Sequence, residues 1–176
     1  MQRNWPSNPG PFCGASLVAP NWVLTAAHCT EGFAPSGLTL LINWDDVQVT
    51  NPTVGEVRQV TEIHDHPDYN PQTLQYDLSL MYIGEASTYR PVELDDGTFS
   101  QVGQMGPVAG WGRTNNGNPT NWPDQPHAVQ VPIWSNAQCN EPASYPGQVA
   151  TTCDQMCVCF SLFSPSDVCT CPSGRV

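Results

Sequence analysis

Two cysteines, Cys13 and Cys29, bracket a pair of short apolar segments, and this arrangement limits the local fold more than any other stretch. The first segment reads C-G-A-S-L-V from Cys13, and the second reads W-V-L-T from Trp22. Residues 19–21, Ala-Pro-Asn, lie between them and are typical of a tight turn. We therefore expect an antiparallel hairpin in which Cys29 is tied to Cys13. In the chain-entropy model, a disulfide that closes about 15 residues contributes roughly 3 kcal/mol.

A histidine, His28, ends the return segment directly before Cys29. Two small residues, Ala26 and Ala27, precede it, so the backbone can turn closely and leave room for a substrate and a nucleophile. Imidazole titrates near neutral pH, which suits a general base. The alternative is a core histidine whose ring nitrogens are satisfied by backbone hydrogen bonds.

Turn-forming residues predict many short strands. The 176 residues include 18 Pro and 14 Gly, which favours strands joined by turns over long helices. Apolar or alternating runs predict strands at residues 38–42, 54–63 and 129–133. We expect an all-β protein large enough for one real core.

The charge balance limits the partners. Sixteen acidic residues stand against five arginines and no lysine, which gives a net charge of −11 and argues against a nucleic-acid partner. The simplest account of the excess acid is solubility. The sequence has no run of 18 apolar residues, so we expect no membrane span.

Asp77 is a second candidate for chemistry. It precedes Leu78, Leu80 and Met81, and an isolated charge in such an apolar strand would be costly without a partner. Beside His28, the carboxylate would accept the imidazole N–H, fix the tautomer and stabilise the imidazolium. The alternative is an aspartate that caps a turn at the start of a strand.

Several of these stretches resemble the trypsin/chymotrypsin-like serine proteases, peptidase family S1. Residues 13–18 and 22–29 are similar to the histidine region of that family, with its small-small-His-Cys ending. The family motif H-P-x-Y-N is intact at residues 66–70, just ahead of Asp77. Residues 108–112, V-A-G-W-G, resemble the strand that opens the second barrel.

The resemblance implies an all-β fold of two six-stranded antiparallel β-barrels. We expect a single trypsin-like domain over residues 1–176, with a first barrel at about 10–95 and an incomplete second barrel at about 100–176. The sequence opens without a signal peptide and stops three residues after Ser173, so we expect a fragment that is truncated at both ends.

The resemblance also implies a peptide-bond hydrolase. A degraded form of the family's nucleophile turn survives at residues 167–174, and it places Ser173 as the nucleophile. His28 would move the proton and Asp77 would orient His28, in the chymotrypsin-type order. Asp167 would lie at the base of the specificity pocket and select Arg or Lys substrates.

Two replacements near Ser173 predict that the chain is inactive or impaired. Cys171 stands where the family has a glycine that lends its N–H to the oxyanion hole. Pro172 stands where relatives have an aspartate that receives the activating amine. The alternative function is a non-catalytic, protease-like binding module.

Eight cysteines indicate an oxidising compartment, and the resemblance implies an extracellular protein. It also implies a disulfide between Cys139 and Cys157. Scrambled pairing of the remaining cysteines is favoured over a zinc site, because no C-x-x-C spacing occurs. These cysteines are Cys153, Cys159, Cys169 and Cys171.

We expect protein or peptide substrates, a monomer, and neither a cofactor nor a metal. The acidic residues 43–46 lie where several relatives bind calcium, but a solvated turn is the favoured interpretation. His64 and His66 lack a third ligand at a recognisable spacing, so an exposed strand end is favoured over a metal site.

Overall fold

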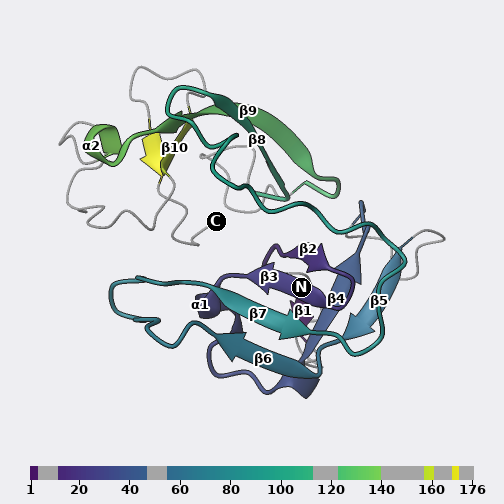
Figure 1. Cartoon of the computed structure of the whole chain (residues 1–176). Helices are drawn as coiled ribbons and strands as arrows, with labels where there is room; N and C mark the ends of the chain where they lie inside the picture. Colours follow the sequence, from purple (N-terminus) through teal and green to yellow (C-terminus); the bar gives the residue numbers. More distant parts are fainter. Residues whose placement is uncertain (4–11, 47–54, 113–122, 140–156, 161–167, 171–176) are drawn as a thin grey trace. The chain divides into compact units, whose positions relative to one another are not determined.

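Nearly all of the regular secondary structure in the described residues is β-strand, which confirms the predicted all-β class (Figure 1). The structure is a computed structural model that describes residues 1–3, 12–46, 55–112, 123–139, 157–160 and 168–170. Within them, two four-residue helices and one 3₁₀ turn, η1 (Pro35–Gly37), accompany the strands, and no helix is long and apolar enough to cross a membrane. The chain divides into two compact units. The first unit comprises residues 1–94 with 111–126, and the second comprises 95–110 with 127–176.

The predicted hairpin lies in a four-stranded antiparallel sheet of the first unit. Its strands, in the order β2-β3-β7-β6, are β2 (Ser16–Ala19), β3 (Trp22–Thr25), β7 (Ser79–Tyr82) and β6 (Glu62–Asp65). Asn21, in the turn between β2 and β3, donates from Nδ2 to the Gly84 carbonyl and accepts from the Ile83 N–H. The hairpin turn is therefore fixed to the chain that leaves β7.

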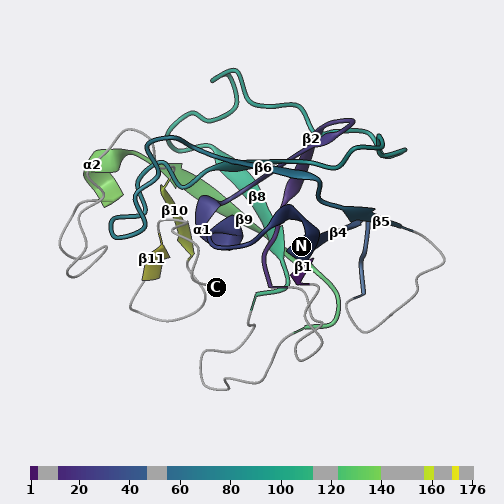
Figure 2. The same ribbon diagram turned by 90° about the horizontal axis from the view of Figure 1, so that it is seen from below.

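A second sheet of the first unit has the order β1-β4-β5. Its strands are β1 (Gln2–Arg3), β4 (Leu38–Ile42) and β5 (Glu56–Gln59), and Figure 2 shows β4 beside β5. The single strand expected at residues 54–63 is thus wrong, because β5 pairs with β4 whereas β6 pairs with β7. Val60, which is 1% exposed, lies at the break between the two strands.

The hydrophobic core of the first unit draws on both sheets. Leu38 and Leu40 on β4 pack with Val23 on β3 and Met81 on β7. Leu38 and Met81 are both 0% exposed. Full burial of an aliphatic side chain contributes about 1.5–3 kcal/mol, so this cluster is a main source of stability for the unit that carries the candidate site.

Glu56 at the start of β5 anchors the segment that follows β7. Its carboxylate accepts from Ser87 Oγ at 2.8 Å and from Thr88 N at 2.9 Å, and it lies 3.2 Å from the Arg58 guanidinium. Burial raises the pKa of Glu56, but the hydrogen bonds from Thr88 and Ser87 and the charge of Arg58 outweigh it and lower the pKa overall.

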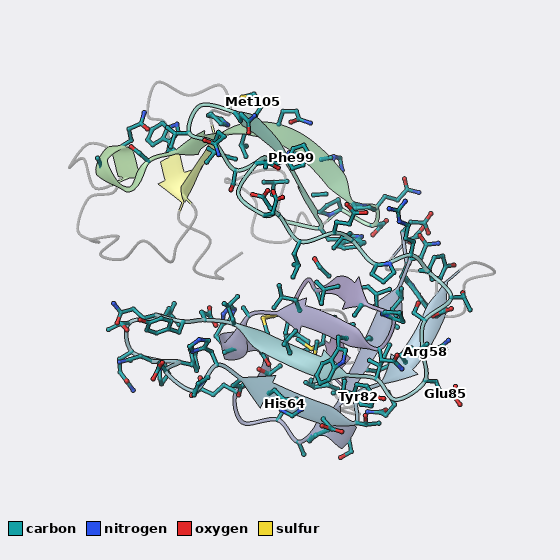
Figure 3. All side chains as sticks on the ribbon, viewed as in Figure 1. Arg58, His64, Tyr82, Glu85, Phe99 and Met105 are labelled. Atoms are coloured by element: carbon teal, nitrogen blue, oxygen red, sulfur yellow. A yellow bond between two sulfur atoms is a disulfide. The ribbon has the colours of Figure 1, made fainter. Side chains whose placement is uncertain are left out.

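The second unit contains a four-stranded antiparallel sheet in the order β11-β10-β9-β8. The strands are β8 (Met105–Gly110), β9 (His127–Trp134), β10 (Cys157–Phe160) and β11 (Val168–Thr170), and the helix α2 (Asn136–Cys139) follows β9. Among the described residues of this unit, Val131 is the buried hydrophobic residue. Phe99 and Met105, labelled in Figure 3, are 78% and 57% exposed.

Candidate active site

His28 lies on a single helical turn, α1 (Ala27–Thr30), which begins two residues after β3 ends. The Glu31 N–H donates to the Ala27 carbonyl at 2.8 Å and closes the turn. Ala27 is fully buried, so no larger side chain fits at this position without moving its neighbours. One turn has little intrinsic stability, and therefore its contacts with the rest of the unit must hold it.

A disulfide between Cys13 and Cys29 provides the first of these contacts. The two Cα atoms are 6.4 Å apart, and the sequence separation is 16 residues. Thr25 Oγ1 donates to the Gly14 carbonyl at 2.9 Å close to the same bridge. The bridge and this hydrogen bond fasten the start of α1 to the chain that leads into β2.

Asp77 provides the second contact and binds His28 at two atoms. Its Oδ2 is 2.6 Å from the ring Nδ1, and its Oδ1 accepts from the His28 backbone N–H at 2.8 Å. A carboxylate can only accept, so Nδ1 carries the proton and the lone pair of the neutral ring is on Nε2. The side chains of His28 and Asp77 are 23% and 11% exposed, which leaves limited access for water.

Nε2 of His28 lies 3.4 Å from Cys29 Sγ. This sulfur belongs to the disulfide and carries no proton, so the contact leaves the Nε2 lone pair able to accept a proton. Cys13, His28 and Cys29 also form the one group of potential metal ligands found in the described part of the chain. Because both sulfurs are in the disulfide, no thiolate is available to a metal.

The segment before β7 presents Asp77 through an uncommon backbone conformation. Leu74 and Tyr76 have φ values of 55° and 53°, in the left-handed region that bulky residues rarely adopt. The Tyr76 ring stacks on His66 with centroids 4.9 Å apart, and the Leu78 N–H donates to the Tyr76 carbonyl at 2.8 Å. A conformation of this kind costs about 1–3 kcal/mol per residue, and both contacts are made by Tyr76.

Three residues that sequence reasoning missed surround this pair. Thr30 Oγ1 lies 2.6 Å from Asp65 Oδ1 on β6. The Tyr69 hydroxyl is buried, and its burial, together with the nearby charges of Asp77, Glu31 and Asp65, raises the pKa of the phenol. The sequence feature that could have identified Tyr69 and Asp65 was the motif at residues 66–70, which contains Tyr69 and directly follows Asp65.

The other predicted site residues are not placed. Ser173 and Asp167 lie outside the described residues, as do Cys153 and Cys171. Cys139 ends α2 and Cys157 begins β10, but the described part of the structure does not include the side chains of these two residues. On the backbone, Cys159 of β10 pairs with Cys169 of β11.

The chain is similar to known trypsins over most of its length. A family model described as Trypsin matches residues 2–174. The chain is 32% identical to Trypsin II-P29 of Gallus gallus over 167 residues, which are 93% of this chain and 62% of that protein. It is 30% identical to Trypsin-3 of Salmo salar over 152 residues, 85% of this chain and 60% of that protein. It is 31% identical to Trypsin of Saccharopolyspora erythraea over 133 residues, 74% of this chain and 56% of that protein.

The matched part thus spans between about half and two thirds of the length of these relatives. The match extends through the hairpin, α1 and the segment that carries Asp77. The all-β architecture agrees with it. This chain belongs to the trypsin family of serine proteases.

Proposed function

We propose that this chain is a serine endopeptidase domain in which His28 is the general base and Asp77 orients it. The single observation that carries the proposal is the pair of contacts from Asp77 to Nδ1 and to the backbone N–H of His28, at 2.6 Å and 2.8 Å. Two contacts fix both the position and the rotation of the imidazole. They leave Nε2 to take a proton from a hydroxyl nucleophile.

Ser173 is the proposed nucleophile, and its assignment rests on the register of residues 167–174. Its hydroxyl oxygen attacks the peptide carbonyl carbon while the hydroxyl proton moves to His28 Nε2. The same proton then goes to the leaving amine, which departs as the C–N bond breaks and an acyl-serine remains. Water hydrolyses that ester and regenerates both groups. Asp167 is the proposed acidic residue that selects Arg or Lys side chains.

We place this activity in an extracellular, oxidising environment. The Cys13–Cys29 disulfide supports that location, because cytosolic proteins keep most thiols reduced. The disulfide holds the turn that carries His28, so the same condition supports the proposed chemistry.

Labelling of the full chain with a fluorophosphonate tests the proposal. We expect a covalent adduct on Ser173, found by peptide mass spectrometry, that forms slowly because Cys171 and Pro172 impair the oxyanion hole and that is absent in His28→Ala. His64→Ala is the matched control, because His64 is an imidazole of the same unit that is 52% exposed and pairs with Glu62. It should label like the wild type. A folded chain that keeps the Cys13–Cys29 bridge and takes no label would refute the peptidase assignment.

A non-catalytic binding module is the second candidate. The observation that favours it is the presence of Cys171 and Pro172 next to Ser173, where relatives have glycine and aspartate. A Cβ at residue 171 removes the backbone freedom of glycine at a position meant to donate its N–H to the oxyanion. Restoring both residues by Cys171→Gly and Pro172→Asp separates the candidates. Label that appears only in the restored chain supports the binding module, whereas label in the unaltered chain supports the enzyme.

A further inference from the structure

The turn α1 is attached to the β6–β7 hairpin at a second point besides His28. Thr30, the last residue of α1, is 1% exposed, and its Oγ1 lies 2.9 Å from the Ala27 carbonyl and 2.6 Å from Asp65 Oδ1. A threonine hydroxyl has one proton to donate. The Ala27 carbonyl already accepts from the Glu31 N–H at 2.8 Å, whereas a carboxylate makes the stronger, shorter bond. The Thr30 proton is therefore assigned to Asp65.

Asp65 and Asp77 belong to the same β6–β7 hairpin, Asp65 at the end of β6 and Asp77 two residues before β7. Asp65 ends β6 and pairs with Ser79, the first residue of β7 and the second residue after Asp77. The next residue along the chain, His66, donates its N–H to the Leu78 carbonyl at 2.8 Å, so the ladder continues as far as the neighbour of Asp77. Two carboxylates on one hairpin thus bind one helical turn, Asp77 at His28 and Asp65 at Thr30.

The disulfide and the two Asp77 contacts hold α1 at Cys29 and His28, whereas the Thr30–Asp65 bond holds the last residue of the turn and limits its tilt. The disulfide holds Cys29, but its rotatable bonds do not define the angle between α1 and β6. Thr30 is two residues beyond His28, which is about 3 Å along a helix axis. A change in the Thr30–Asp65 distance would therefore tilt the turn and alter both contacts between His28 and Asp77. A displacement of about 1 Å between catalytic groups can lower the rate of the catalysed reaction about a hundredfold.

We propose that Thr30 and Asp65 are positioning residues for the His28–Asp77 pair. The inference rests on the proposed function for its catalytic meaning, but its structural content does not depend on Ser173. Their hydrogen bond sets the orientation of α1 against the hairpin, and it thereby keeps the His28 N–H and Nδ1–H aimed at the Asp77 carboxylate.

Amide hydrogen exchange in the full chain tests this inference. The His28 N–H donates to Asp77 Oδ1, so its exchange rate reports the pair directly, without turnover. Met81, on β7 in the core, reports the stability of the whole first unit. In Thr30→Val, which keeps the shape and loses the hydroxyl, we expect exchange at His28 to rise about tenfold, the factor that corresponds to 1.4 kcal/mol. Exchange at Met81 should stay the same.

Three further variants complete the test. Thr30→Ser keeps the hydroxyl and should restore slow exchange at His28. Asp65→Ala removes the acceptor from an exposed strand position and should act like Thr30→Val even if that variant folds poorly. Thr61→Val is the matched control, because the Thr61 hydroxyl donates to the Tyr82 carbonyl, away from α1.

The outcomes separate this inference from the proposed function. Unchanged exchange at His28 in Thr30→Val and Asp65→Ala would overturn the positioning role. So would an equal rise at His28 and Met81, because that pattern indicates a loss of overall stability. Failure of fluorophosphonate labelling would instead refute the peptidase function and leave the exchange result intact.

Discussion

Replacing Asp77 by Asn changes which ring nitrogen of His28 carries the proton. In the native protein the carboxylate accepts from Nδ1, so the proton is on Nδ1. The Asn side chain places an oxygen where Oδ1 accepts the His28 N–H and an NH₂ group where Oδ2 was. The NH₂ group donates, so Nδ1 must become the acceptor and the neutral ring must carry its proton on Nε2. A ring in that tautomer cannot take a proton from a nucleophile.

General hydrogen-bond energies, applied to the two contacts of Asp77, give the size of the stability change. Hydrogen bonds to a charged group contribute about 1.5–3 kcal/mol, against roughly 0.5–1.5 kcal/mol between neutral groups. Two bonds to Asp77 become neutral in the variant, but the cost of burying a carboxylate with 11% exposure also disappears. We expect the free energy of unfolding to fall by about 1–2 kcal/mol at neutral pH.

Two measurements on the full chain check this prediction. Urea unfolding gives the change in stability, and the ¹⁵N chemical shifts of the His28 ring distinguish the two tautomers. Asp68→Asn is the matched control, since Asp68 is an exposed aspartate of the loop between β6 and β7. Persistence of the Nδ1–H tautomer in Asp77→Asn, or equal stability losses in both variants, would refute the reasoning.

Three other changes give separate expectations. The double variant Cys13→Ser/Cys29→Ser should lower the free energy of unfolding by about 3 kcal/mol. Urea unfolding compares the double variant with the oxidised and the reduced wild type. Equal midpoints for all three samples would contradict this expectation. Met81→Ala should cost about 2–5 kcal/mol because Met81 is 0% exposed, whereas the exposed Met105→Ala should change stability by less than about 0.5 kcal/mol in the same assay. The pKa of Glu56 is lowered in the folded protein, so its contribution is present above its ordinary value of 4.5 and is lost as the pH falls through the lowered value. Acid titration of Glu56→Gln should therefore show a smaller loss of stability below about pH 4.5, and an unchanged titration would contradict it.

The sequence predicts the hairpin and the His28–Asp77 pair well because both depend on strong, simple constraints. The hairpin is local, and its turn and cysteines lie within 17 residues. The cost of an isolated carboxylate predicts that Asp77 has a partner, and the resemblance to the trypsin-like family implies that this partner is His28. The expectation that Asp77 lies among buried apolar side chains is partly wrong, because Leu78 and Leu80 are 50% and 39% exposed.

The sequence alone could not predict the hydrogen bond between Thr30 and Asp65. Asp65 stands between two histidines in a stretch that reads as an exposed strand end, and nothing local links it to a residue 35 positions earlier. The link depends on the register between β6 and β7, which tertiary pairing alone defines. Ser173 and Asp167 remain predictions from the degraded motif.

The loop between β6 and β7 has a base that holds Asp77 and an exposed tip that tolerates changes in sequence and length. Its base is closed by the hydrogen bond from His66 N to Leu78 O, and Gln72 and Thr73 at its exposed tip contact the loop's own Asn70 side chain. Lengthening a loop costs only about 0.6 kcal/mol for each doubling. Insertions at the tip can therefore accumulate during evolution, or be introduced by engineering, to diversify this exposed surface while the base keeps Asp77 in place.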